Sequence, residues 1–418
     1  MKRRGATLLA PLSVTAFRRL WAGASLSMLA DQAFLVSLTW LVLRITESGT
    51  SMGAVLAVAS VPGIVLTPLG GVLCDRFAPV HVMSAASAMR AALMAILAIL
   101  VLTGTTQIWH VCVLAGGLSA LDALYYPASM SAVPTLVSND SLNAANALTQ
   151  AVEQISGVVG PAQAGLLLAF LGLWTSLGTN AVLFLISAAI FVAVARAVSP
   201  AARTSETTAT EDGLDANGTG GTLSALVEGV RHAWSDPVIR TILLVLVGIN
   251  LAMAGPVYVG GSLLAETRLG GAGAFGTIVA LAAAGALVGA AGAGSLGRIR
   301  RRGLVEVGAT AVIGVGVGCF AFAPNLLLVG LLAILVGMTA SFMAVMNISW
   351  LQERAGEGLV GRIMSLAMFS TIALDPVSYV LAGFLVEVGL TVVFLAAGGL
   401  LLFTALIAAT SHTMRTAD

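Results

Sequence analysis

Four acidic residues lie deep inside long apolar stretches of the sequence: Asp31, Asp122, Glu153 and Asp375. A carboxylate at the centre of a bilayer costs at least ~2.5–3.5 kcal/mol on insertion scales, so each needs a cavity, a partner or a proton. A carboxyl group in such a place can take up a proton on one side of a membrane and release it on the other. We interpret all four as candidates for proton coupling, with Asp31 as the first choice and Asp122 as the second.

Three of the four acids also have a structural interpretation. Asp31 lies roughly 18 Å along a helix from basic residues on either side, and it could simply hydrogen-bond a neighbouring helix. Glu153 lies nearer to a helix end, where a wet vestibule would explain it. Asp375 precedes Pro376, so its carboxylate could serve a local break in the helix rather than a proton relay.

Other polar and aromatic residues complete the set of candidates. Tyr125 and Tyr126 follow Asp122 by one helical turn, while Phe34 shares the helical face of Asp31. With Tyr258, these residues are predicted to contact a substrate, because small-molecule pockets are apolar with a few polar groups. Arg90 is expected to snorkel to the inner headgroups, with pairing to an acid as the alternative.

The composition defines the elements that must carry these residues. Hydrophobic residues make up 58% of the 418 residues and charged residues only 9%, against the ~25% charged residues of a typical soluble domain. Apolar runs of about 20 residues, long enough to cross a bilayer, recur about twelve times. The predicted spans are 20–43, 52–73, 82–103, 108–132, 145–171, 177–197, 238–262, 273–296, 305–323, 326–350, 364–386 and 389–410. The predicted fold is therefore all-α, with twelve membrane-spanning helices.

Several classes of function are excluded by what the sequence lacks. No dense basic tract of the kind that binds nucleic acid is present. The histidines fall at interfaces or in loops and predict no metal site. No phosphate-binding loop, zinc-protease helix or nucleophile elbow is found, so neither a cofactor nor an enzymatic activity is expected.

The basic residues predict the orientation. If the N-terminus is inside the cell, Arg44 and Arg268 are the only Lys or Arg residues in outer loops. This asymmetry follows the positive-inside rule and predicts that both termini are cytoplasmic. We expect a multi-pass protein in a bacterial-type cytoplasmic (inner) membrane, working as a monomer in the lipid bilayer.

One long polar stretch divides the spans into two groups of six. The predicted domains are an N-terminal six-helix bundle at 1–197, a cytoplasmic linker at 198–237 and a C-terminal six-helix bundle at 238–418. Apolar residues recur at helical spacing from Leu223 to Trp234, which predicts an amphipathic helix in the linker.

Matching features in the two halves suggest a duplication. Gly160-Pro161 in the fifth span and Asp375-Pro376 in the eleventh span would each weaken a helix at a comparable depth. Paired interruptions of this kind indicate a central transport site. Gly157, Gly160, Pro161 and Gly165 are therefore predicted to form a bending and tight-packing element.

The stretch Gly71-Val72-Leu73-Cys74-Asp75-Arg76 resembles the loop motif between helices two and three of the major facilitator superfamily. Helix five, around Gly157 to Gly165, is similar to the antiporter motif of drug exporters in that superfamily. Leu142-Asn143-Ala144-Ala145-Asn146 and Gly361-Arg362-Ile363-Met364 resemble the branch that holds macrolide-efflux and enterobactin-exporter-type proteins. The resemblance covers essentially the whole chain.

This resemblance implies two pseudo-symmetric six-helix bundles that rock about a central cavity. Gly71, Asp75 and Arg76 would latch the cytoplasmic side in one state. The implied function is export of small amphipathic or hydrophobic molecules in exchange for protons. The alternatives are a dedicated siderophore or lysolipid exporter, and a non-transporting sensor built on a transporter scaffold.

Overall fold

The computed structural model describes residues 9–197, 231, 234–295, 301–354 and 360–410. The side chains of residues 68–76, 139, 140, 143, 360–362 and 365 lie outside this description. The described residues are helical apart from short turns and contain no strand. They fall into two compact units, one of residues 1–45 and 58–214 and one of residues 46–57 and 215–418.

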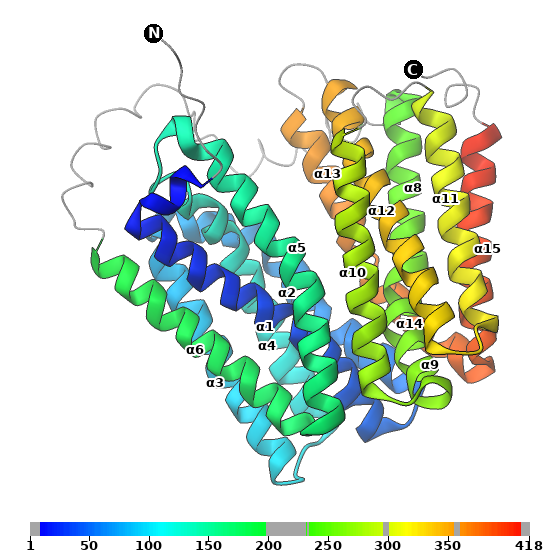
Figure 1. The fold of residues 1–418 in the computed structure, drawn as a ribbon, viewed down its shortest axis with the longest axis horizontal. Helices are drawn as coiled ribbons and strands as arrows, with labels where there is room; N and C mark the ends of the chain where they lie inside the picture. The colour runs from blue at the N-terminus through cyan, green and yellow to red at the C-terminus, as the bar shows by residue number, and fades with distance from the viewer. Residues whose placement is uncertain (1–8, 198–230, 232–233, 296–300, 355–359, 411–418) are drawn as a thin grey trace. The chain divides into compact units, whose positions relative to one another are not determined.

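The first unit is a bundle of long helices (Figure 1). After a short turn at Ala10–Ser13, its helices are α1 (Thr15–Thr46), the greater part of α2 (Gly49–Arg76), α3 (Pro79–Leu102), α4 (Ile108–Ala132), α5 (Asn139–Phe170) and α6 (Leu173–Ala197). Helix α3 packs along both α4 and α6. It begins at Pro79, which suits the first helical turn because that position needs no backbone N–H donor.

Besides residues 46–57, which include the start of α2, the second unit contains one long interrupted span that begins with α8 (Pro237–Gly255). Helix α8 continues through a π-helical turn η3 (Pro256–Gly260), a short α9 (Gly261–Leu264) and a second π-helical turn η4 (Ala265–Leu269). Gly270 ends it in the left-handed region with φ of 94°, which a glycine adopts without steric cost. The remaining helices are α10 (Ala272–Ser295), α11 (Arg302–Cys319), η5 (Phe320–Phe322), α12 (Leu326–Arg354), α13 (Val360–Ile372), α14 (Asp375–Val388) and α15 (Leu390–Thr410).

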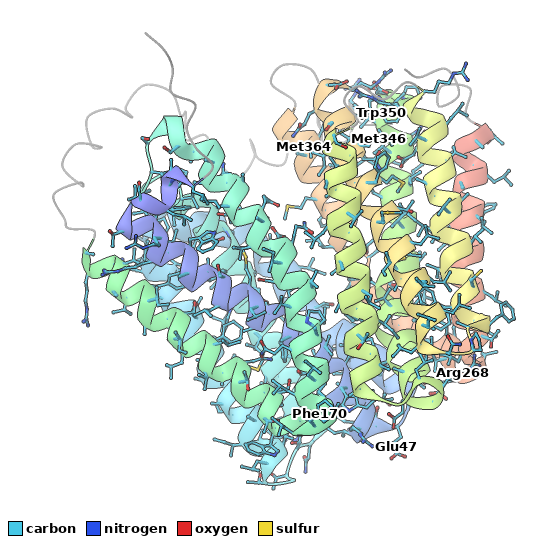
Figure 2. All side chains as sticks on the ribbon, in the orientation of Figure 1. Glu47, Phe170, Arg268, Met346, Trp350 and Met364 are labelled. Carbon is cyan, nitrogen blue, oxygen red and sulfur yellow. The ribbon has the colours of Figure 1, made fainter. Side chains whose placement is uncertain are left out.

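Close backbone approach holds α10 against α12. A Cβ added at Gly285 or Gly289 would collide with the backbone of α12, and one added at Gly337 would collide with the backbone of α10. Small residues at such spacing let helices approach closely in a membrane, where van der Waals contact drives association. Trp350, near the C-terminal end of α12, is 2% exposed and packs with Ile239 and Met364 (Figure 2).

The start of α8 is fixed by Asp236. Its Oδ1 accepts hydrogen bonds from the N–H groups of Val238 and Ile239, at 2.8 and 3.3 Å, and its Oδ2 accepts one from Nε of Arg354 at 3.0 Å. Partial burial by itself would raise the pKa of Asp236, but these hydrogen bonds outweigh it and lower the pKa. Asp236 thus caps α8 and joins it to the end of α12.

Eleven helices of the described part of the chain are long and apolar enough to cross a membrane. Helix α5 is a further long helix of 32 residues, with a polar first half. The prediction of twelve helices in an all-α membrane fold is confirmed. Large apolar side chains such as Phe170 and Leu327, 80% and 73% exposed, cover the outside of the helices, as a hydrocarbon solvent requires.

The two proline steps have different outcomes. Helix α5 runs through Pro161 as one helix. The eleventh span is divided: α13 ends at Ile372, and α14 begins at Asp375 with Pro376 in its first turn. The predicted linker helix lies outside the described residues, except for Arg231 and Trp234.

Candidate functional site

The centre of the first unit holds a buried arginine. Arg90 is the twelfth residue of the 24-residue helix α3, and its side chain is 1% exposed. The prediction that Arg90 snorkels to the headgroups is wrong. The apolar run begins at about residue 82, but the helix already begins at Pro79, so Arg90 lies at its middle and is too far from either end.

Two acids share this arginine. Nη1 of Arg90 donates to Oδ2 of Asp31 at 3.3 Å, while Nη2 forms an ion pair with Oδ1 of Asp122. Nη1 also donates to the hydroxyl of Ser27, one turn before Asp31, at 3.1 Å. The structure therefore brings the first two proton-coupling candidates onto one guanidinium, from α1 and α4.

Aromatic rings hold the guanidinium in place. The Tyr125 ring centroid lies 4.3 Å from Cζ of Arg90, and the Phe184 ring centroid lies 5.5 Å from it. Both distances fall within the range of cation–π attraction. Tyr125 is 4% exposed and packs against Phe191, with centroids 6.2 Å apart. In this structure Tyr125 supports Arg90, and its predicted contact with a substrate stays a prediction.

Burial and charge are unevenly distributed in this cluster. The side chains of Asp31 and Asp122 are 32% and 51% exposed, whereas that of Arg90 is 1% exposed. One fixed positive charge thus faces two carboxylates that remain accessible. If both are ionised, one negative charge is left over, and a proton or a cationic ligand could neutralise it.

Helix α5 packs directly on the turn that carries Asp31. A Cβ built on Gly160 would lie 2.7 Å from Cβ of Gln32 and 3.0 Å from both the backbone N of Ala33 and the carbonyl oxygen of Leu29. Gly160 and the neighbouring Pro161 and Gly165 are buried, and Gly157 is half-buried. Any larger residue at 160 must displace α1 at Asp31.

The remaining candidates of the first unit lie at its edges. Glu153 and Phe34 are half-buried, and Tyr126 is 42% exposed. Glu153 is near enough to Tyr126 for the two side chains to interact electrostatically. Neither of them touches the Arg90 cluster through any contact described here. Of Gly71, Asp75 and Arg76, the structure describes only the backbone of α2; their side chains lie outside the described residues.

In the second unit, Asp375 lies next to polar residues of two helices. Asn250 of α8 hydrogen-bonds Asp375, and its Nδ2 also donates to the carbonyl oxygen of Thr371, in the turn before the break. Tyr258 and Tyr379 form an edge-to-face pair with centroids 6.4 Å apart. Asp375 therefore lies at the break between α13 and α14, together with an amide from α8.

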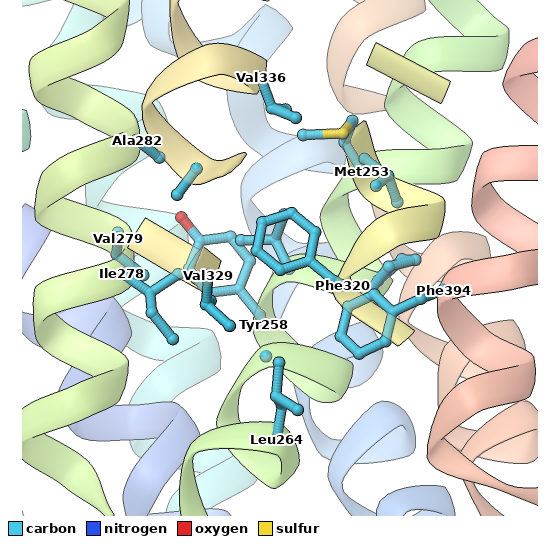
Figure 3. Close-up of a pocket in the computed structure, with 15 residues that line it drawn as sticks. Met253, Tyr258, Leu264, Ile278, Val279, Ala282, Phe320, Val329, Val336 and Phe394 are labelled. Atoms are coloured by element: carbon cyan, nitrogen blue, oxygen red, sulfur yellow. The ribbon is translucent and has the colours of Figure 1, made fainter. Parts of the chain in front are cut away.

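Tyr258 also lines an apolar pocket of about 200 Å³ in the second unit. Figure 3 shows its ring across the pocket from the side chains of Phe320 and Phe394. Met253, Val336 and Leu264 form other parts of the wall. The pocket is concave and apolar, as a site for a hydrophobic group should be. Tyr258 itself comes from the π-helical turn η3, a distortion that is frequent at functional sites.

Sequence reasoning missed two features. Pairing of Arg90 with an acid was only the alternative interpretation, and Asp31 and Asp122 were not named as its partners, because the three residues are 32 or more positions apart and only packing brings them together. Glu306 was not singled out, although its side chain is 0% exposed. It lies four residues after Arg302, close to the start of the helix. The sequence alone does not show where the charged end of this helix stops and its apolar, buried part begins.

No group of three or more His, Cys, Asp or Glu side chains within the described ranges is arranged to hold a metal ion.

The sequence profile of the Major Facilitator Superfamily matches residues 20–374. The chain belongs to this superfamily. It is therefore a multi-pass membrane transporter and not an enzyme, and the family resemblance predicted from its motifs is confirmed.

Two named relatives of this chain are exporters, one similar over nearly its full length and one over part of it. The chain is 28% identical over 399 residues to a multidrug efflux pump, Tap, of Mycolicibacterium fortuitum, with 92% of each chain covered. It is 27% identical over 256 residues to the enterobactin exporter of Shigella boydii, covering 61% of this chain and 58% of that protein. Among solved structures, the peptide-family transporter PepTSo matches with a TM-score of 0.74 at 13% identity, covering 97% of this chain and 99% of that one. This last likeness shows the fold alone.

Proposed function

We propose that this protein exports small amphipathic or hydrophobic molecules from a bacterial cell in exchange for protons, by alternating access across the cytoplasmic membrane, with both termini inside. The observation that carries the proposal is the buried Arg90, which is shared by two partly exposed acids. The similarity to a multidrug efflux pump over 92% of the chain supports export of drug-like molecules.

The exchange follows from the charge of the cluster. Asp122 is paired directly with Nη2 of Arg90, while Asp31 shares Nη1 with Ser27 at a longer distance. Asp31 is therefore the acid whose charge is less well compensated. A proton on Asp31 leaves a neutral Arg90–Asp122 pair. Release of that proton restores a net negative charge, which a cationic amphipathic molecule could offset in its place, so proton and substrate would compete.

The other predicted residues take supporting roles in this proposal. Phe34 and Tyr126 are candidates for substrate contact in the first unit, and Tyr258 is a candidate in the second unit, where it lines the apolar pocket. Gly160 and the neighbouring glycines of α5 would transmit movement to the turn that carries Asp31. Glu153 and Asp375 remain secondary candidates for proton transfer, and Asp75 and Arg76 candidates for a latch.

The test uses inside-out vesicles that hold a proton gradient, with wild-type protein and the Asp31→Asn variant side by side. Hydrophobic cations, macrolides and siderophores are added in turn while a pH-sensitive dye reports the gradient. We expect one class of compound to collapse the gradient in the wild type and not in the variant. Collapse in both would assign coupling to another acid, with Asp122→Asn as the next variant.

A siderophore exporter is the second candidate, and it is favoured by the similarity to the enterobactin exporter over 61% of the chain. The same panel separates the two, because siderophores and hydrophobic cations are added as separate compounds. If no compound affects the gradient and counterflow in proteoliposomes equals that of empty liposomes, the transport proposal fails and a sensor function is favoured.

A further inference from the structure

A fully buried acid lies in the second unit, far along the chain from the Arg90 cluster. Glu306 is in the second turn of α11 and is 0% exposed. Asn347, in α12, is 1% exposed and faces it. The two side chains are held together by a hydrogen bond of 3.0 Å from Nδ2 of Asn347 to Oε1 of Glu306.

This hydrogen bond leaves two atoms without partners. They are Oε2 of Glu306 and Oδ1 of Asn347, both buried. If the carboxyl group is ionised, both atoms are hydrogen-bond acceptors, so neither can satisfy the other. One hydrogen atom on Oε2 removes the conflict, because the carboxylic acid then donates to the amide oxygen while it accepts from the amide nitrogen.

Within the part of the chain that the structure describes, no positive charge on the elements packed against α11 compensates an ionised Glu306. Helix α11 packs against α12, α15 and η5. Neither Leu390–Thr410 nor Phe320–Phe322 contains a titratable residue. On α12, the Glu353 carboxylate accepts hydrogen bonds from Nη1 and Nη2 of Arg302, at 2.7 and 3.1 Å. Arg354, also on α12, forms an ion pair with Asp236.

The remaining residues near Glu306 do not provide a hydrogen bond or a buried positive charge to its carboxyl group in the contacts described. Arg301 is exposed, at the residue that precedes α11. The hydroxyl of Thr310 donates to the backbone carbonyl of Glu306 at 2.8 Å, not to its carboxyl group. A buried carboxylate with a single neutral donor is strongly disfavoured, whereas a carboxylic acid paired with an amide is fully hydrogen-bonded.

We propose that Glu306 and Asn347 form a proton-binding site in the second unit, in which Glu306 is a carboxylic acid and Asn347 recognises its protonated form. The ligand is a proton, held on Oε2 and donated to Oδ1 of Asn347. Loss of that proton breaks the O–H bond and leaves both buried oxygens as acceptors without a donor. The proton can therefore leave only when α11 and α12 move apart enough for water or another donor to reach the carboxylate. This site is independent of the exchange proposed for Asp31.

Infrared spectroscopy of the purified protein in lipid tests the proposal. A protonated carboxylic acid has a carbonyl-stretch band that a carboxylate lacks, and the difference between wild type and Glu306→Gln isolates the contribution of Glu306. We expect a carboxylic-acid band at neutral pH that is lost in Glu306→Gln and shifts in Asn347→Ala, where its hydrogen bonds change. The Asp31→Asn variant is a control that should retain the Glu306 band. Loss of a carboxylate band in place of an acid band would overturn the proposal.

Thermal stability gives a second, independent test. A glutamine at position 306 can accept from Nδ2 of Asn347 and donate to its Oδ1, so it reproduces the proposed pairing without a proton. We expect Glu306→Gln to melt at the temperature of the wild type, and Glu306→Leu, which leaves Asn347 without a partner, to melt lower. A Glu306→Gln variant that fails to fold, or melts as low as Glu306→Leu, would show that a charge is required and would overturn the proposal.

Discussion

The two units bury acids in opposite ways. In the first, Asp31 and Asp122 are 32% and 51% exposed and are paired with a fully charged arginine. In the second, Glu306 is 0% exposed, and an amide is the only side chain that hydrogen-bonds it among the contacts described. Solvent-accessible acids beside the fixed positive charge of Arg90 can exchange protons quickly, whereas a fully buried acid that is hydrogen-bonded to an amide keeps its proton. Proton exchange during transport is thus expected in the first unit and proton retention in the second.

The largest expected effect comes from removing the shared charge. Arg90→Leu would leave two carboxylates without a cation, and breaking a buried ion pair in this way costs about 3 kcal/mol. We expect a large drop in melting temperature in detergent and loss of transport. Arg90→Lys keeps the charge but not the fork that serves both acids, so it should recover much of the stability and little of the exchange. Wild-type stability in Arg90→Leu would contradict the ion-pair interpretation.

The next prediction compares the two units directly. Asp31→Asn should reduce substrate-driven proton movement to the level of vesicles without the protein, while Glu306→Gln should leave it close to the wild-type rate. Both replacements exchange a carboxyl group for an amide of the same size, so each is the control for the other. Proton movement in inside-out vesicles is the measurement. Equal losses of proton movement in both variants would contradict the proposal that Asp31 exchanges protons while Glu306 keeps its proton.

A smaller effect is expected where α5 packs on α1. Gly160→Val would place methyl groups against Gln32 and Ala33, and overpacking of this kind costs about 1–3 kcal/mol. We expect a lower melting temperature together with reduced proton exchange, since the displaced turn carries Asp31. Gly178→Ala in α6 is the matched control, because a Cβ there meets nothing within 4 Å. If Gly160→Val keeps full exchange, this packing does not position Asp31.

The smallest effect concerns Asp236, which caps α8. Asp236→Ala removes a helix cap and a partly exposed ion pair, and should lower the free energy of unfolding by about 1 kcal/mol. The pKa of Asp236 is lowered in the folded protein, so its contribution is complete above its unfolded pKa and is lost as the pH falls through the folded value. The melting temperatures of wild type and variant should therefore converge below about pH 4. A constant difference down to lower pH would mean that the charge of Asp236 contributes nothing.

The sequence was sufficient for the fold but for only part of the site. Twelve spans could be predicted because an apolar run of membrane length is a local property of the chain. Asp31 and Asp122 stood out for the same reason, as charges inside such runs. The break before Pro376 was predicted from the missing backbone donor, yet Pro161 leaves α5 intact, because the packing around a helix decides whether it breaks there.

What could not be predicted depends on packing between distant segments. Arg90 was assigned to the headgroups because the predicted span begins at residue 82, whereas helix α3 begins at Pro79, so the distance from Arg90 to the helix end was underestimated. Its pairing with Asp31 joins residues 59 positions apart. Glu306 lies in the second turn of α11, where the side chains on one face of the helix are buried and those on the other face are exposed. The packing of α12 and α15 against α11, which the sequence does not reveal, buries Glu306.

The shared arginine also has a consequence for how the protein is made. Helices enter the membrane in the order of the chain, so α1 with Asp31 is inserted before α3, and α4 with Asp122 after it. An arginine at the centre of an isolated helix costs at least ~2.5–3.5 kcal/mol to insert. Asp31 is the only one of the two acids already in the bilayer when Arg90 arrives, and Asp122 completes the neutralisation one helix later. The charges that we assign to transport thus also favour α3 settling beside α1 during biogenesis, before the rest of the bundle exists.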